Sequence, residues 1–286
     1  MVPDYHLHSQ FSKDSSALLE DYCRLALEFG IPEIAVTEHF TLYSFDKNFA
    51  GFDYANFIQE VERCRLRFKG QVAVKAGVEI DYHPCFEQKI KETIKNWDKL
   101  DVIIGSVHYI EGKSALKSKI EGKEEAEDFI SNYFQIMEQM IQSGICDIIG
   151  HFDVFRRSLN KDFPLKSYLE KSEKILQQAA HHNLALELNT SGFKHGICDI
   201  FPNIEIVKMF KKYGGKYITI GSDAHHHEEF DVKQDEAIIA AKTAGFNHIT
   251  CFEKRRSYLI SLNLNNTQNH IKQASPFHRG LYFPMF

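Results

Sequence analysis

Histidines and carboxylates stand at or near the ends of successive apolar segments of this 286-residue sequence. Imidazoles and carboxylates are the side chains that hold catalytic transition metals in proteins. Apolar segments have no packing reason to end repeatedly in ionisable groups, so this placement predicts a metal site gathered from distant parts of the chain. The segments are DYHLHS with His6 and His8, IAVTEHF with Glu38 and His39, AVKAGVEIDYH with Glu79 and Asp81, VIIGSVH with His108, DIIGHFD with His151 and Asp153, ALELNTSG with Glu187, and ITIGSDAHH with Asp223 and His225.

The pair His6 and His8 is separated by one residue in a segment that we expect to be extended. Alternate residues of a strand point to the same side, so both imidazoles can reach one ion. An H-x-H spacing is weak evidence alone. It gains weight here because the other candidates occupy corresponding positions at the ends of later segments.

Helix-like segments separate the apolar ones. The first, Ser16–Phe29, places leucine, tyrosine and phenylalanine at helical spacing, and Gly30 and Pro32 end it. Strand followed by helix, repeated many times, indicates a parallel sheet with crossover helices. The other predicted helices are Tyr54–Phe68, Phe86–Asn96, Glu124–Gln142, Leu165–His182, Ile204–Tyr213 and Gln234–Ala244.

Seven or eight such units with short links favour a closed barrel over an open doubly wound sheet. No G-x-G-x-x-G follows the first predicted strand, which weakens the dinucleotide-binding form of the open sheet. In a barrel of this type the carboxyl ends of the strands share one face, where catalytic groups collect. We therefore expect the metal site at the C-terminal ends of the strands.

Two segments interrupt the alternation. Thr41–Asp53 is aromatic and polar, as expected of a loop over the barrel mouth, and Glu111–Glu127 carries many charges, as expected of a solvated insertion before a helix. We predict one barrel domain over residues 1–262. Residues 263–286 have no clear period and are expected to form a tail that is either docked or disordered.

The composition narrows the possible partners. A formal charge of −5 argues against a broad nucleic-acid surface but allows a small phosphorylated ligand. Six cysteines lie singly along the chain, as expected of reduced structural thiols. We expect a cytoplasmic protein without a membrane partner, because no secretory signal or apolar span is apparent. The sequence does not indicate an oligomeric state.

Together these segments resemble the PHP (polymerase and histidinol phosphatase) superfamily of phosphoesterases over about residues 3–255. The motifs that carry the resemblance are DYHLHSQFSKDS, VTEH, GVEIDY, GSVHY, GHFDVFRR, ELNTSG and GSDAHH. Within the superfamily, the length and the GHFDVFRR and ELNTSG segments are most similar to bacterial histidinol-phosphate phosphatases. The resemblance implies a distorted (β/α)7 TIM-like barrel with up to three metal ions, and it places the last apolar run, HITCFEK, outside the closed barrel.

The same resemblance implies a ligand for each of three metal positions. Some family members have a histidine at the position of Asp14, in FSKDS. As a serine-flanked aspartate, Asp14 is also a candidate helix N-cap. The resemblance implies two to three ions, and mixed nitrogen and oxygen ligands fit zinc, iron or manganese. The implied sets are His6, His8, Glu79 and Asp223 for the first ion, Glu79, His108 and His151 for the second, and Asp14, His39 and His225 for the third.

The chemistry of such a set follows from its donors. A carboxylate can bridge two ions, and bridged ions acidify a shared water and clamp phosphoryl oxygens. The sequence contains neither a cysteine nucleophile motif nor a P-loop, so attack by a metal-bridging hydroxide is the economical mechanism. The resemblance implies a single in-line displacement without a phosphoenzyme.

Further residues are predicted to serve substrate and proton transfer. Arg156 and Arg157 follow the His151 segment, where the family has a phosphate-binding arginine, and the sequence does not separate the two. Lys194 lies where the family often has an arginine. Asp223 is a candidate ligand and also a candidate acid for the leaving group, and Asp153 is a candidate proton carrier or ligand-orienting group.

The resemblance predicts hydrolysis of L-histidinol phosphate to L-histidinol and phosphate. The imidazole and amine of that substrate require an acidic or aromatic recess, for which Tyr43, Phe45, Phe52 and Tyr109 are candidates. One alternative is a PHP phosphatase for a nucleotide, a sugar phosphate or protein phosphotyrosine. The other is a non-catalytic metal-binding module, against which the complete ligand set argues.

Overall fold

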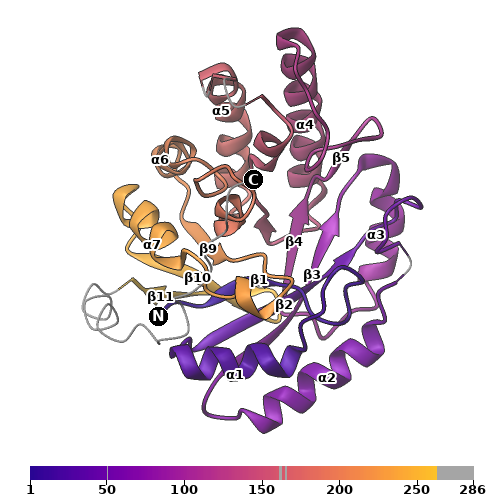
Figure 1. The fold of residues 1–286 in the computed structure, drawn as a ribbon, viewed down its shortest axis with the longest axis vertical. Coiled ribbons are helices and arrows are strands. Elements are labelled where there is room, and N and C mark those ends of the chain that lie inside the picture. Colours follow the sequence, from indigo (N-terminus) through magenta and orange to yellow (C-terminus); the bar gives the residue numbers. More distant parts are fainter. Residues whose placement is uncertain (50, 161–162, 165, 263–286) are drawn as a thin grey trace, which may run out of the picture.

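Seven parallel strands form a nearly closed barrel in the computed structural model, which describes residues 1–49, 51–160, 163–164 and 166–262 (Figure 1). Their order around the barrel is β1-β2-β3-β4-β7-β8-β9. The strands are β1 (Asp4–Leu7), β2 (Glu33–Phe40), β3 (Ala73–Asp81), β4 (Val102–Ser106), β7 (Ile148–Ile149), β8 (Ala185–Asn189) and β9 (Tyr217–Gly221). The predicted barrel of seven units is confirmed.

The barrel closes between β1 and β9 through a short seam rather than a continuous ladder. The His8 amide donates to the Ala224 carbonyl at 2.9 Å, and the Asp223 amide donates to the His6 carbonyl at 2.8 Å. The buried carboxylate of Asp4 adds a bond to each side, because its Oδ1 accepts from the amides of His6 and Ser222, both at 3.1 Å. The seam thus joins the segment of His6 and His8 to the segment of Asp223, and both contain predicted metal ligands.

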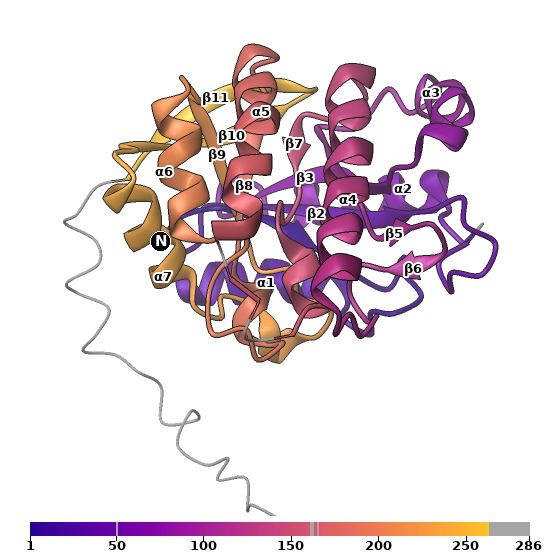
Figure 2. The ribbon, with the colours of Figure 1, turned by 90° about the horizontal axis from the view of Figure 1, so that it is seen from above.

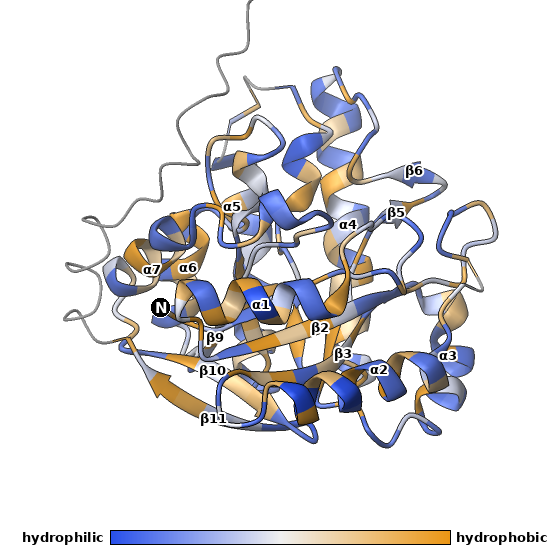
Figure 3. Ribbon diagram, turned by 60° about the horizontal axis from the view of Figure 1, so that its bottom comes forward, coloured by the Kyte–Doolittle hydropathy of each residue, from blue (hydrophilic) through white to orange (hydrophobic). Residues whose placement is uncertain are grey.

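Seven helices cover the outside of the barrel within the described residues (Figure 2). Their apolar faces turn inward and their polar faces outward, as the hydropathy colouring in Figure 3 shows. Each predicted helix is present, with ends that differ by at most a few residues. The helices are α1 (Leu19–Phe29), α2 (Tyr54–Arg67), α3 (Glu87–Ile94), α4 (Lys123–Ser143), α5 (Lys166–His181), α6 (Ile204–Lys212) and α7 (Gln234–Thr243).

A hairpin of β10 (His248–Glu253) and β11 (Arg256–Ser261) packs against the N-terminal end of the barrel. Phe252 and Cys251 join a buried cluster with Tyr5 and with residues near the starts of β2, β4, β7 and β8. The Tyr5 hydroxyl accepts from the Phe252 amide at 2.6 Å. The run HITCFEK therefore lies outside the seven-stranded barrel, as expected.

The charged segment Glu111–Glu127 is less solvated than its composition indicates. It contains the two-residue strand β6 (Lys113–Ser114), which pairs with β5 (Tyr109–Ile110), and it buries Ala115 and Ile120. The Ile120 amide donates to the Ser158 carbonyl at 2.8 Å, so the segment packs beside the loop after β7. Apolar residues spaced among lysines were too few to show this in the sequence.

The predicted tail, residues 263–286, lies outside the described residues, so its docked or disordered state stays a prediction. Among the residues that the structure describes, no helix has the length and apolar character needed to cross a membrane.

Candidate metal centre

Glu79, near the end of β3, lies at the middle of the predicted site and is 1% exposed. Its two carboxylate oxygens face different groups. Oε1 lies 2.9 Å from Nε2 of His151 and 3.4 Å from Nε2 of His108. Oε2 lies 3.4 Å from Nε2 of His6 and 3.5 Å from Nε2 of His8. This is the arrangement that a carboxylate shared between two ions requires.

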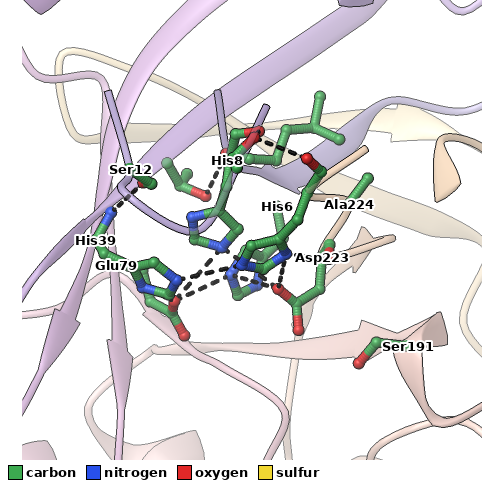
Figure 4. Close-up of polar contacts among 12 residues, drawn as sticks. His6, His8, Ser12, His39, Glu79, Ser191, Asp223 and Ala224 are labelled. Atoms are coloured by element: carbon green, nitrogen blue, oxygen red, sulfur yellow. Dashed lines mark hydrogen bonds and ion pairs between the residues drawn. The ribbon is translucent and has the colours of Figure 1, made fainter. Parts of the chain in front are cut away.

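Asp223 completes the group on the Oε2 side. Its Oδ1 lies 3.3 Å from Nε2 of His8 and 3.7 Å from Nε2 of His6. Figure 4 shows His6, His8 and His39 converging on Glu79 and Asp223. Asp223 has a positive φ of 54°, a conformation uncommon for a residue with a side chain, at the point where the chain leaves β9. The β1–β9 seam holds it in that conformation.

Asp14, His39 and His225 form a third group nearer the surface. Asp14 Oδ2 lies 3.5 Å from Nε2 of His39 and 3.8 Å from Nε2 of His225. The two imidazole nitrogens are 3.3 Å apart. His39 also links this group to the centre, since its Nδ1 lies 2.9 Å from Glu79 Oε2. We call Glu79, His6, His8, His108, His151 and Asp223 the inner group, and Asp14, His39 and His225 the outer group.

The donor atoms of these groups suit metal ions. Three sets have donors within 4.8 Å of one another: His8, His39 and His225; His6, His8 and Glu79; and Glu79, His108 and His151. Ligand atoms about 2.1 Å from one tetrahedral ion lie about 3.4 Å apart, which matches the spacing within the inner group. Nε2 of both His6 and His8 is buried without a hydrogen-bond partner among the described residues. Buried nitrogens of this kind are costly unless they bind something.

Side chains behind the inner group fix its orientation. Glu187, at the middle of β8, has Oε1 at 2.7 Å from Nδ1 of His6, and its Oε2 accepts from the His151 amide at 2.6 Å. Ser106 donates its hydroxyl to Glu79 Oε1 at 2.6 Å. A carboxylate on the far nitrogen of a ligand histidine selects its tautomer and raises its basicity. The sequence placed Glu187 among the ionisable groups at strand ends, and its contacts are those of a group that orients the ligands.

Glu38 lies on the opposite side of β2 from His39 and organises the loop after β1. Its carboxylate accepts from the hydroxyls of Ser9 and Ser12 and from the Ser9 amide at 3.1 Å. Burial raises the pKa of Glu38 to about 7 despite these bonds. Ser12 in turn accepts from the His39 amide at 3.0 Å, so this buried carboxyl connects the loop to the outer group.

Burial and neighbouring charges set the protonation of the metal-free groups. Burial acts to raise the pKa of Glu79, but His6 and His108 outweigh it and hold the pKa well below its usual range. Burial, with Glu79 as the main opposing charge, lowers the pKa of His108 to about 4. For Asp14, burial is outweighed by His39, His8 and His225, and the pKa falls to about 2. Ionised carboxylates and a neutral imidazole are the forms that bind metal. At His39, contact with Glu79 outweighs burial and raises the pKa to about 9, so metal binding there would release a proton.

A pocket of about 490 Å³ opens over both groups. Its walls include Arg157, Lys194 and His195 from the loops after β7 and β8. They also include Phe45, Asp46 and Tyr109 from the loops after β2 and β4. Of the four aromatic residues proposed from the sequence, Phe45 and Tyr109 line the pocket. Tyr43 packs against Tyr109 with ring centroids 4.7 Å apart and ring planes tilted by 56°. Phe52 instead packs against Phe57 and Trp97.

The structure separates the two adjacent arginines of the 3-10 turn Val154–Arg157. Arg157 lines the pocket, whereas Arg156 is engaged outside its described lining. Arg156 donates to Asp199 at 2.9 Å and to the Ile200 carbonyl at 3.0 Å, and it lies over the Phe201 ring. Arg157 is therefore the arginine of the pair that lines the pocket, and Arg156 holds the turn.

Asp153 and Lys194 also have partners that differ from those expected. Asp153 is fully buried and is not part of the pocket lining. It accepts from the Tyr168 hydroxyl at 3.2 Å and lies 3.4 Å from Arg156 Nη1. Lys194 donates to the Asp223 carbonyl at 2.8 Å and pairs with Glu229 at 3.1 Å. Asp153 therefore supports the site from behind the pocket, whereas Lys194 is part of the pocket wall and also braces the backbone of Asp223.

Three acidic residues at the pocket had no role assigned to them from the sequence. Asp46 accepts from the Tyr109 hydroxyl at 2.6 Å, and Glu229 accepts from the His225 amide at 2.8 Å. Asp81 is buried beside His108 and accepts from Thr41 at 3.2 Å. Burial, with Glu79 and Asp46 nearby, raises the pKa of Asp81 well above its usual range. Only Asp81 had a signal, because it ends an apolar segment two residues after Glu79.

A parallel barrel with a cluster of histidines and carboxylates at the C-terminal ends of its strands is typical of metal-dependent hydrolases. Comparison with known proteins gives the family: residues 4–191 match the PHP domain. The chain belongs to the PHP family.

Relatives of known name extend the comparison. Histidinol-phosphatase of Lactococcus lactis is 29% identical over 269 residues, covering 87% of this chain and 93% of the relative. A probable histidinol-phosphatase of Deinococcus radiodurans is 25% identical, covering 86% and 96%. The crystal structure of the Lactococcus lactis histidinol phosphate phosphatase, complexed with zinc, L-histidinol and phosphate, is similar with a TM-score of 0.80 and 26% identity. That likeness covers 90% of this chain and 100% of the other.

Proposed function

We infer that this chain is a metal-dependent histidinol-phosphatase, which hydrolyses L-histidinol phosphate to L-histidinol and phosphate. The named relatives are similar over most of both chains, and the similar crystal structure contains zinc, L-histidinol and phosphate. The ligand geometry supports a metallophosphatase independently of those names. The finer assignments below, of each residue and each ion, belong to this proposal.

The distribution of charge around the pocket is the observation that supports L-histidinol phosphate as the substrate. Arg157 and Lys194 come from the loops after β7 and β8 and form what we call the cationic arc. His195 lies beside them, but burial and the charge of Arg157 lower its pKa to about 4, so it adds no positive charge at neutral pH. Phe45, Asp46 and Tyr109 come from loops after β2 and β4 and form the acidic aromatic arc. The strand order places these arcs on different parts of the barrel rim. They suit a substrate with a phosphoryl group at one end and a cationic, ring-bearing group at the other.

Within the cationic arc, Arg157 is the residue that we assign to the phosphoryl oxygens. A guanidinium presents paired donors to two oxygens, which a lysine cannot do. Arg156 holds the turn through Asp199 and Ile200, and Asp153 holds Arg156, so both act on substrate through Arg157. Lys194 fixes the backbone of Asp223 and contributes positive charge at the pocket wall.

The inner and outer groups would hold two to three ions of zinc, iron or manganese. When bound, such ions lower the pKa of a water and draw charge from the phosphoryl oxygens. The chain supplies their placement: Glu79 is shared between His6 and His8 on one side and His108 and His151 on the other. Glu187 and Ser106 hold these donors in position while the pocket walls orient the ester.

Asp223 is better suited to ligation than to proton donation. Burial acts to raise its pKa, but His6, His8 and His225 outweigh burial and hold the pKa well below its usual range. A carboxylate that stays ionised is a poor acid for the leaving alkoxide. We therefore assign Asp223 as a metal ligand.

Phosphate release from a substrate panel tests this function. The panel contains L-histidinol phosphate, AMP, glucose 6-phosphate and a phosphotyrosine peptide, with the metal content of the purified protein quantified. We expect kcat/KM for L-histidinol phosphate to exceed the others by at least about a hundredfold, because only that substrate matches both arcs. Asp46→Asn should narrow this preference, while Glu92→Asn on the exposed face of α3 serves as a control.

A similar kcat/KM for all four substrates would reject the histidinol assignment and leave a general metallophosphatase. A preference that Asp46→Asn does not narrow would reject the acidic aromatic arc as the site of substrate choice. Absence of turnover by protein with bound metal would favour a binding role.

A further inference from the structure

Lys47 brings a positive charge to the outer group. Its Nζ lies 3.4 Å from Oδ2 of Asp14, the same oxygen that faces His39 and His225. The ammonium and an ion held by the outer group would therefore use one carboxylate. We propose that Lys47 is a built-in competitor for the outer metal position, which lowers the affinity of that position for its ion. This inference rests on the proposed metal assignment and concerns its regulation.

The loop that carries Lys47 is fastened on both sides of it. Asp46 accepts from the Tyr109 hydroxyl at 2.6 Å, and Asn48 accepts through its side chain from the Lys13 amide at 2.8 Å. Asn48 is buried, and Lys13 immediately precedes Asp14. The two bonds hold the backbone of Lys47 above Asp14. Its approach to the carboxylate is therefore supported by the fold around it.

The outer group is the one in which such competition has most effect. It has one carboxylate of its own, whereas the inner group has both Glu79 and Asp223. The inner carboxylates have no lysine or arginine side chain within ion-pair distance among the described residues. A divalent ion at Asp14 would be repelled by an ammonium a few ångströms away, although solvent reduces this repulsion at a partly exposed site.

Displacement of Lys47 by an ion is physically accessible. The lysine side chain is 57% exposed, and it belongs to the wall of the same pocket. A flexible ammonium can therefore leave Asp14 for solvent or for an anion in the pocket without unfolding the loop. The competition lowers the affinity for the third ion rather than preventing its binding, and it leaves the inner ions unaffected.

Zinc titration of the metal-free protein tests the proposal, with free zinc set by a chelating buffer and bound zinc measured by elemental analysis. Lys47→Met should bind the third equivalent about tenfold more tightly, because the competing charge is gone. Lys47→Arg, which keeps the charge, should stay close to the wild type. Lys117→Met removes another pocket lysine that has no ion pair with Asp14 in the described residues, and it should have no such effect.

Three results would overturn the proposal. They are an unchanged or weaker third equivalent in Lys47→Met, equal tightening in Lys117→Met, and no third equivalent in any of the proteins. Circular dichroism establishes that each variant is folded, and Lys47→Gln replaces Lys47→Met if the latter is not. The titration contains no substrate, so a failure of the histidinol assignment in the substrate panel would leave this result standing.

Discussion

The inner and outer groups differ in how the fold supports them. The inner ligands lie at or near the ends of strands, and Glu187 and Ser106 hold them from behind. Glu79 is 1% exposed. The outer group takes Asp14 from a loop, its Asp14 and His225 side chains are 15% and 23% exposed, and Lys47 contacts it. On the proposed metal assignment, the difference predicts that the inner group holds its ions more tightly than the outer group does.

The largest effect is expected at the residue that the two inner positions share. Glu79→Gln removes the charge between two ions, so we expect kcat/KM to fall by about a thousandfold or more. Bound metal should fall by close to two equivalents while the far-ultraviolet circular dichroism is unchanged. The control is Glu92→Gln, which changes an exposed glutamate of α3. Near-normal activity with full metal content in Glu79→Gln would contradict the proposal that Glu79 bridges two ions.

The next largest loss of metal affinity or activity is expected at Glu187, which lies behind the inner group. Glu187→Gln keeps the shape of the side chain but replaces one carboxylate oxygen by an amide that cannot accept from both His6 and the His151 amide. We expect the affinity for the inner ions, or the activity, to fall by about 10–100-fold. Zinc titration and kcat measured at saturating zinc separate the two effects. An unchanged zinc affinity together with an unchanged kcat would show that β8 supports the site only through its backbone.

A smaller effect is expected for the outer group. Asp14→Asn should abolish the third equivalent of metal and lower kcat/KM by about tenfold, because the inner ions stay in place. Elemental analysis and steady-state kinetics measure these changes. Loss of all bound metal in this variant would contradict the separation of inner and outer groups.

Away from both groups, we expect an effect on stability and none on activity. Burial, with Asp4 and Asp235 nearby, raises the pKa of Asp231 from its usual 3.8 to about 7. The folded protein then binds a proton that the unfolded chain releases above pH 3.8, so this contribution to stability is lost as the pH rises from about 4 to 7. Between pH 5 and pH 7, the free energy of unfolding of the metal-free Asp231→Asn variant should fall by about 2 kcal/mol less than that of the metal-free wild type. Chemical denaturation at pH 5 and pH 7 measures this. An identical pH dependence in the variant would contradict a buried, protonated Asp231.

The barrel and the inner group could be predicted because both follow from local patterns. Apolar segments alternating with amphipathic helices define the parallel barrel, and a histidine or carboxylate at a strand end must lie at its C-terminal face. Glu79 with His108 and His151 illustrates this, since all three lie at or just beyond the ends of neighbouring strands. The identity of Arg157 as the pocket arginine could not be predicted in this way. It depends on Arg156 reaching Asp199 and Ile200, which lie more than forty residues further along the chain.

The roles of several loop residues also could not be predicted from the sequence. Asp46 is one polar residue among several in its loop, and only the hydroxyl of Tyr109 from the loop after β4 identifies it. Lys194 occupies a position where the family often has an arginine, yet its contacts with Asp223 and Glu229 depend on the loop after β9. Contacts between loops depend on how the strands are arranged around the barrel, and the order of residues does not give that arrangement.

The β10–β11 hairpin has a consequence for turnover. Tyr5, Cys251 and Phe252 close the N-terminal end of the barrel in the described part of the chain, so water, ester and products share the mouth above the metal centre. Inorganic phosphate formed at the metal centre must leave through the opening by which the next ester enters. We therefore expect accumulated phosphate to compete with the ester for this single opening.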